Sequence, residues 1–135
     1  MSVIYLAGPI NGCTDPEARD WRTDIAKRLP EHTILSPMVR DYHGHEYLSA
    51  DEIVSGDKAD IDSCDILIAY CPKPSVGTSM EVLYAWERRH HVIVWAPSGH
   101  PTMSPWLRYH AHTICVSLDS TTAAARMAAS RLVCP

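Results

Sequence analysis

The chain has 135 residues, of which 46% are hydrophobic and 21% are charged, and its formal net charge is −4 at neutral pH. This size and composition predict one globular domain, residues 1–135, with a core of its own. The negative charge argues against a nucleic-acid polymer as partner, and the apolar start is too short to cross a bilayer, which argues against a membrane partner.

The five cysteines, at positions 13, 64, 71, 115 and 134, are odd in number and irregular in spacing. This pattern predicts neither a disulfide framework nor a zinc site, and it fits a reducing, cytoplasmic location. The pairs His43-x-His45 and His110-x-His112 have no cysteine or carboxylate at metal-ligand spacing. We therefore expect no metal site.

In chain order, short apolar segments alternate with helical patterns. Strands are expected over residues 2–8, 32–36, 65–70, 91–96 and 112–117. Helices are expected over 15–29, 49–63, 78–89 and 119–132, the last beginning at Asp119 or Ser120. This alternation predicts an α/β fold, flavodoxin-like or Rossmann-like, with a five-stranded parallel sheet and helices on both faces. Segments 36–48 and 97–111 are expected to be irregular binding loops.

The stretch from Pro74 to Glu81 follows an apolar strand pattern, so we expect it at the carboxyl edge of the sheet, where open α/β sheets bind ligands. Thr78-x-x-Glu81 is also a capping-box sequence, in which both side chains bond backbone N–H groups at a helix start. The same pattern occurs at Thr14-x-x-Glu17 and Ser49-x-x-Glu52. Glu81 therefore has two interpretations, a helix cap or a reactive carboxylate.

A group of acids precedes the third expected strand. Helical spacing places Asp57 and Asp60 on one face, whereas Asp62 points elsewhere. One interpretation is a solvated acidic helix end. The other pairs Asp57 or Asp60 with Glu81, because glycosidic bonds are cleaved by two carboxylates, one at the anomeric carbon and one that manages the proton of the leaving group.

Four motifs, in this order and spacing, resemble the nucleoside 2-deoxyribosyltransferases and their relatives, the 2'-deoxynucleoside 5'-monophosphate N-glycosidases. Together they span most of the chain. They are Tyr5-Leu6-Ala7-Gly8-Pro9, Asp57-x-x-x-Ile61-x-x-x-Asp65, Pro74-Ser75-Val76-Gly77-Thr78-Ser79-Met80-Glu81 and Met103-Ser104-Pro105-Trp106-Leu107-Arg108.

The resemblance implies catalytic roles for three residues. Glu81 matches the nucleophile, and Tyr5 matches a tyrosine that hydrogen-bonds and orients it. Asp57, eight residues before Asp65, matches the acid that handles the base, in preference to Asp60. No cofactor is implied.

The resemblance also implies substrate contacts and an oligomer. Relatives that bind a 5'-phosphate use a serine and a glycine that match Ser75 and Gly77, together with a serine of the neighbouring subunit that matches Ser104. At least a homodimer is therefore expected. Further substrate contacts are expected from Gly8, Asn11, Asp60, Thr78 and Arg40.

The implied reaction transfers the deoxyribosyl group of a 2'-deoxynucleoside to another base or to water, through a covalent glycosyl ester on Glu81. Pro9 and Asn11 stand where phosphate-using relatives have a serine and an arginine, which favours nucleosides over 5'-monophosphates. Losing such a charged donor weakens anion binding by about 1.5–3 kcal/mol. Arg19, Arg22, Arg40 and Arg108 remain candidates to replace that arginine.

Other functions remain open. A monophosphate N-glycosidase is the nearest alternative. A phosphoribohydrolase similar to the cytokinin-activating proteins is less favoured, because Ser75-Val76 replaces their paired glycines. A hydrolase of a modified deoxycytidylate and a non-catalytic nucleotide-binding module are further possibilities, since a fold does not settle function.

Overall fold

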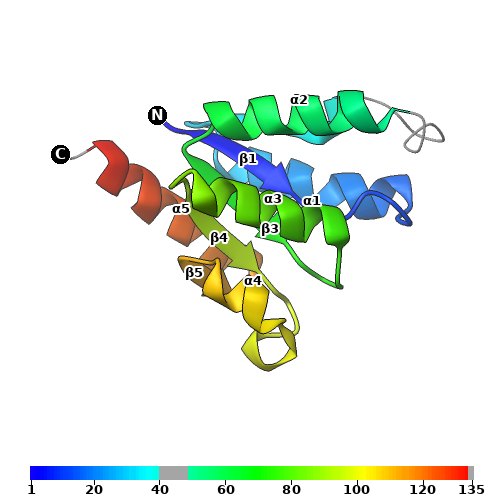
Figure 1. Cartoon of the computed structure of the whole chain (residues 1–135). Coiled ribbons are helices and arrows are strands. Elements are labelled where there is room, and N and C mark those ends of the chain that lie inside the picture. The colour runs from blue at the N-terminus through cyan, green and yellow to red at the C-terminus, as the bar shows by residue number, and fades with distance from the viewer. Residues whose placement is uncertain (40–48, 134–135) are drawn as a thin grey trace.

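The computed structural model describes residues 1–39 and 49–133, which form a parallel sheet with helices on both faces (Figure 1). The strands are β1 (Val3–Ala7), β2 (Thr33–Leu35), β3 (Ile66–Tyr70), β4 (His91–Trp95) and β5 (Thr113–Cys115). Their order in the sheet is β2-β1-β3-β4-β5, and every neighbouring pair is parallel. This is the flavodoxin-like order, so the predicted fold class is confirmed.

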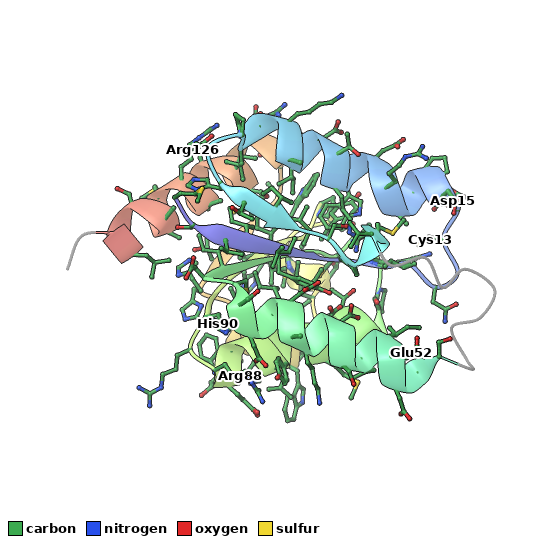
Figure 2. The ribbon with its side chains drawn as sticks, turned by 90° about the horizontal axis from the view of Figure 1, so that it is seen from above. Cys13, Asp15, Glu52, Arg88, His90 and Arg126 are labelled. Atoms are coloured by element: carbon green, nitrogen blue, oxygen red, sulfur yellow. The ribbon has the colours of Figure 1, made fainter. Side chains whose placement is uncertain are left out.

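Two long helices cover each face of the sheet (Figure 2). On one face lie α1 (Asp15–Arg28) and α5 (Leu118–Val133); on the other lie α2 (Ala50–Ser63) and α3 (Val76–Glu87). Because side chains alternate along a strand, Ile4 and Leu6 pack toward α1 and α5, whereas Tyr5 and Ala7 pack toward α2 and α3. No helix in the described ranges is both long and apolar enough to cross a membrane.

Helix α3 begins earlier than its sequence predicts. Ser75 is the N-cap, and its hydroxyl oxygen accepts a hydrogen bond from the Thr78 N–H at 3.4 Å. The expected start at Thr78 is therefore wrong, and Glu81 lies in the second turn of the helix. The box at Thr14 and Glu17 does form, with both of its hydrogen bonds present.

The expected opening of α2 by Ser49 is confirmed, since Ser49 is its N-cap, although the Ser49 side chain makes no capping hydrogen bond. Helix α5 begins at Leu118 rather than Asp119 or Ser120, because the Ser117 hydroxyl oxygen accepts from the Ser120 N–H at 3.0 Å.

The expectation of irregular structure over 97–111 is wrong in part. This segment contains a short 3-10 helix, η2 (His100–Thr102), and the one-turn helix α4 (Pro105–Tyr109). Ser104 caps α4 by accepting from the Trp106 N–H at 3.2 Å, and Pro105 suits the first helical position. In segment 36–48, a 3-10 helix, η1 (Pro37–Val39), is present, and residues 40–48 lie outside the described ranges.

Candidate active site

The carboxyl ends of β1 and β3 open into a cavity of about 360 Å³. Its walls come from the loop after β1, from η1, from α2 and from the start of α3. Cys13, in the loop before α1, and Asp15, the first residue of α1, lie at this end of the molecule, as does Glu52 near the start of α2 (Figure 2). The cavity wall contains most of the site residues expected from the sequence, namely Gly8, Asn11, Asp57, Ser75, Gly77, Thr78 and Glu81.

The Tyr5 hydroxyl donates a short hydrogen bond to Oε2 of Glu81. Tyr5 is fully buried beneath α2 and α3, whereas Glu81 is half-buried and reaches the cavity. Burial raises the pKa of the Tyr5 phenol far above its ordinary value of 10.0, and the nearby carboxylates of Glu81 and Asp57 raise it further. Tyr5 therefore keeps its proton and acts as a donor to Glu81.

The interpretation of Glu81 as a helix cap is wrong. Because Ser75 supplies the helix cap, Thr78 sits inside the helix and no box with Glu81 can form at the helix start. The Glu81 carboxylate instead faces Tyr5 and the cavity.

The start of α3 offers polar groups to the cavity. A Cβ built on Gly77 would meet nothing within 4 Å, so no packing contact of the described chain requires glycine there. Glycine in a helix costs about 1 kcal/mol relative to alanine, and here it leaves the backbone open to the cavity. Thr78 is 2% exposed, and its hydroxyl oxygen has no hydrogen-bond partner among the described residues.

The loop after β1 is held by close packing against α1. A Cβ on Gly8 would lie 2.4 Å from Cζ2 of Trp21, so only glycine fits this position. Arg22 donates to the main-chain carbonyls of Leu6 at 3.4 Å and Gly8 at 3.1 Å, and also to that of Ala18. These contacts fix the path of the chain from β1 into the cavity wall.

The arginines considered as phosphate contacts do not line the cavity in the described part of the chain. Arg22 binds carbonyls, and Arg19 pairs with Asp20 at 3.2 Å on the surface. Arg108 lies on α4, and Arg40 is outside the described ranges. The described wall carries three carboxylates, Asp15, Asp57 and Glu81, and no lysine, arginine or histidine.

Two expected site residues lie away from this cavity. Asp60 is one turn beyond Asp57 on α2 and does not contribute to the described wall. Ser104 lines a different cavity, of about 440 Å³, together with Met80 and Trp106.

Sequence reasoning missed several residues of the wall. Asp15 resembled an ordinary acid in the first turn of a helix, and Ile10, Ile53 and Val54 resembled core residues because they are apolar. The described residues contain no group of three or more potential metal ligands.

Solved structures share this fold at low sequence identity. A 2-deoxyribosyltransferase from Bacillus psychrosaccharolyticus aligns with a TM-score of 0.73 and 17% identity, over 90% of each chain. A conserved protein from Enterococcus faecalis aligns with a TM-score of 0.69 and 14% identity, over 94% of this chain and 98% of its own. A CMP N-glycosidase from Clostridium botulinum aligns with a TM-score of 0.62 and 16% identity, over 93% and 98%.

No curated protein sequence matches this chain. Residues 4–124, however, match the sequence profile of the nucleoside 2-deoxyribosyltransferases. That range begins in β1 and ends within α5, so it includes every element that forms the cavity. The chain therefore belongs to the nucleoside 2-deoxyribosyltransferase family.

Proposed function

We propose that this protein cleaves the N-glycosidic bond of 2'-deoxynucleosides and transfers the deoxyribosyl group to another base or to water. The contact between Tyr5 and Glu81, in a cavity that Asp57 also lines, is the observation that carries the proposal. Family membership supports the reaction class, and the Bacillus structure named as a 2-deoxyribosyltransferase supports transfer as an outcome.

In the first step, an oxygen of the Glu81 carboxylate attacks the anomeric carbon while the bond from that carbon to the base nitrogen breaks. Asp57 donates its proton to the departing base, which leaves neutral. Tyr5 keeps its own proton and holds Glu81 in line with the sugar. The products are a glycosyl ester on Glu81 and an ionised Asp57.

In the second step, an acceptor base or a water molecule attacks the same carbon from the vacated side. Asp57 takes a proton from the acceptor, the ester bond breaks, and Glu81 is again a carboxylate. Two inversions give net retention at the anomeric carbon. The chain's own side chains supply every proton and the nucleophile, so the proposed cycle uses no cofactor.

The charge of the cavity favours uncharged nucleosides over their 5'-monophosphates. A phosphate would enter a wall that holds the carboxylates of Asp15 and Glu81, beside the protonated Asp57 of the first step, and no described cation. Two like charges 4 Å apart repel by about 1 kcal/mol in water and by more where solvent is excluded. Ser75, Gly77 and Thr78 at the start of α3 line the cavity, and polar groups there can bond a 5'-hydroxyl.

We also propose that the protein forms at least a homodimer, in which Ser104 serves the neighbouring site. Ser104 does not line the cavity of its own chain, but it lies beside the start of α3 in the 440 Å³ cavity. Large apolar side chains around it are exposed, including Met80 at 67% and Trp106 at 73%. A second copy would cover this surface.

Replacing Glu81 with glutamine tests the nucleophile. We expect Glu81→Gln to lower activity by orders of magnitude, because an amide cannot attack, while the free energy of unfolding changes by only about 1 kcal/mol. Glu87→Gln, at the exposed end of the same helix, is the matched control and should keep full activity. With wild type and a 2-fluorinated deoxynucleoside, mass spectrometry should find a sugar adduct on Glu81; full activity in Glu81→Gln would overturn the mechanism.

The neighbouring variants Asp57→Asn and Asp60→Asn test which acid protonates the base. We expect Asp57→Asn to lower the rate about 10²–10⁴-fold with a natural base and much less with a pre-activated leaving group, which needs no proton. Asp60→Asn should change the rate little with either substrate. The reverse pattern, measured by chromatography of the released base, would assign the acid to Asp60.

Substrate preference is tested by comparing kcat/KM for 2'-deoxynucleosides and their 5'-monophosphates, each with and without an acceptor base. We expect nucleosides to react at least as well as monophosphates. Asn11→Arg, which restores a cation to the cavity wall, should raise the relative kcat/KM for monophosphates about tenfold or more. A wild-type preference for monophosphates would indicate an N-glycosidase, and no turnover of any substrate would favour a binding module.

Assembly is tested by light scattering at the concentrations used for activity assays. We expect wild type to be at least a dimer and Met80→Asp to shift the mass toward the monomer with loss of activity, because it places a charge in the proposed interface. Met127→Asp is the matched control, since Met127 is 57% exposed but lies on α5, across the sheet from Met80. A fully active wild-type monomer would contradict the proposal.

A further inference from the structure

Arg22 is an arginine buried in the core of the molecule, beside the candidate active site. Its side chain comes from α1, and the residue is only 4% exposed. Arg19, one turn earlier on the same helix, is instead on the surface and paired with Asp20. Burying a charge is unfavourable unless other groups compensate for the lost water, so the position of Arg22 requires an explanation.

Hydrogen bonds account for part of that compensation. The guanidinium donates to the carbonyls of Leu6, Gly8 and Ala18, and it lies over the ring of Trp21 at 4.5 Å from the ring centre. Each of the three guanidinium nitrogens thus donates one hydrogen bond, but none of these partners carries a negative charge. The compensating charges must therefore lie farther away.

The acidic groups of the candidate site surround Arg22 from several elements. They are Tyr5 on β1, Cys13 on the following loop, Asp57 on α2 and Glu81 on α3. Burial lowers the pKa of Arg22 to about 10, and all four groups act in the opposite direction. Electrostatic coupling is mutual, so the guanidinium favours negative charge on these groups to the same extent.

Tyr5 links Arg22 to the nucleophile. Burial and the nearby carboxylates raise the pKa of Tyr5 strongly, so Tyr5 keeps its proton and donates a hydrogen bond to Glu81. A hydrogen bond donated to a carboxylate favours its charged form, and the Arg22 cation acts in the same direction. Asp57 takes up its proton for the proposed reaction against the effect of the same cation.

The hydrogen bonds of Arg22 also fix the position of the chain at the end of β1. The carbonyls of Leu6 and Gly8 follow Tyr5 directly along the chain, and Gly8 is part of the cavity wall. Fixing both carbonyls fixes the end of β1, and with it the position from which the Tyr5 hydroxyl approaches Glu81.

We propose that Arg22 is a positioning residue for the nucleophile: its buried guanidinium holds the carbonyls at the end of β1, and thereby the Tyr5 hydroxyl whose hydrogen bond to Glu81 favours the carboxylate form. The link to catalysis rests on the proposed function of Glu81, but the effect on the charge of Glu81 does not. Arg22 is not part of the described cavity wall, and in this proposal it acts through Tyr5 and Glu81.

The test is a titration of the Glu81 carboxyl by ¹³C NMR, in protein labelled at the glutamate side chains. The Glu81 signal is assigned by its absence in Glu81→Gln. We expect the titration midpoint of Glu81 to rise by about half a pH unit or more in Arg22→Gln, which keeps hydrogen-bond donors but removes the charge. Arg22→Met is a second neutral variant, for the case that Arg22→Gln does not fold. Arg19→Gln removes a surface charge from the same helix and should leave the midpoint unchanged.

Enzyme kinetics give a second readout. In the neutral variants, the acidic limb of the kcat profile should move to higher pH by the same amount as the Glu81 midpoint. In Arg22→Lys, which keeps the charge but not the planar fork, the limb should stay in place while kcat falls at every pH. An unchanged Glu81 midpoint in a folded neutral variant would overturn the inference. Failure of wild type to cleave any nucleoside would overturn the proposed function, but the effect of Arg22 on the Glu81 midpoint could still be measured.

Discussion

The hydrogen bond between Tyr5 and Glu81 depends on the order of the strands. β1 lies between β2 and β3, and the chain leaves β1 for one face of the sheet and β3 for the other. The loops after these two strands therefore diverge and leave the cavity between them, as at other points where the strand order reverses. At this place a side chain of β1 meets a side chain of α3 beside an open cavity.

The same hydrogen bond resolves an energetic conflict. A buried phenol without a partner would cost about 1–3 kcal/mol, and a partly buried carboxylate also loses water. Tyr5 and Glu81 satisfy each other, and a hydrogen bond to a charged acceptor is stronger than one between neutral groups. Because Tyr5 is packed in the sheet, its hydrogen bond holds the carboxylate in one orientation. A nucleophile needs such a fixed orientation to attack along a defined line.

The sequence predicted the order of strands and long helices well, because apolar runs separated by clear caps leave few alternatives. Where the predicted start of a helix was wrong, two nearby residues could each serve as the N-cap. Ser75 and Thr78 are both good N-caps three residues apart, and the choice depends on where the loop after β3 turns, which is a property of the fold. Helical periodicity did not decide between Asp57 and Asp60 as the second acid of the site, and the family resemblance favoured Asp57. Arg22 was beyond prediction as a buried residue, because α1 is rich in charged residues and the burial depends on carbonyls of β1.

The distribution of charge around the cavity suits the chemistry of a glycosidic bond. As that bond breaks, positive charge develops on the sugar ring, and preorganised negative groups stabilise it. The described wall provides the carboxylates of Glu81 and Asp15, with Asp57 holding the proton for the leaving base, and it contains no cation. Arg22, the one buried charged residue among those described, directs its N–H groups to main-chain carbonyls on the α1 side. In the proposed role it acts on Glu81 from outside the described wall, so that the residues lining the cavity remain the acids alone.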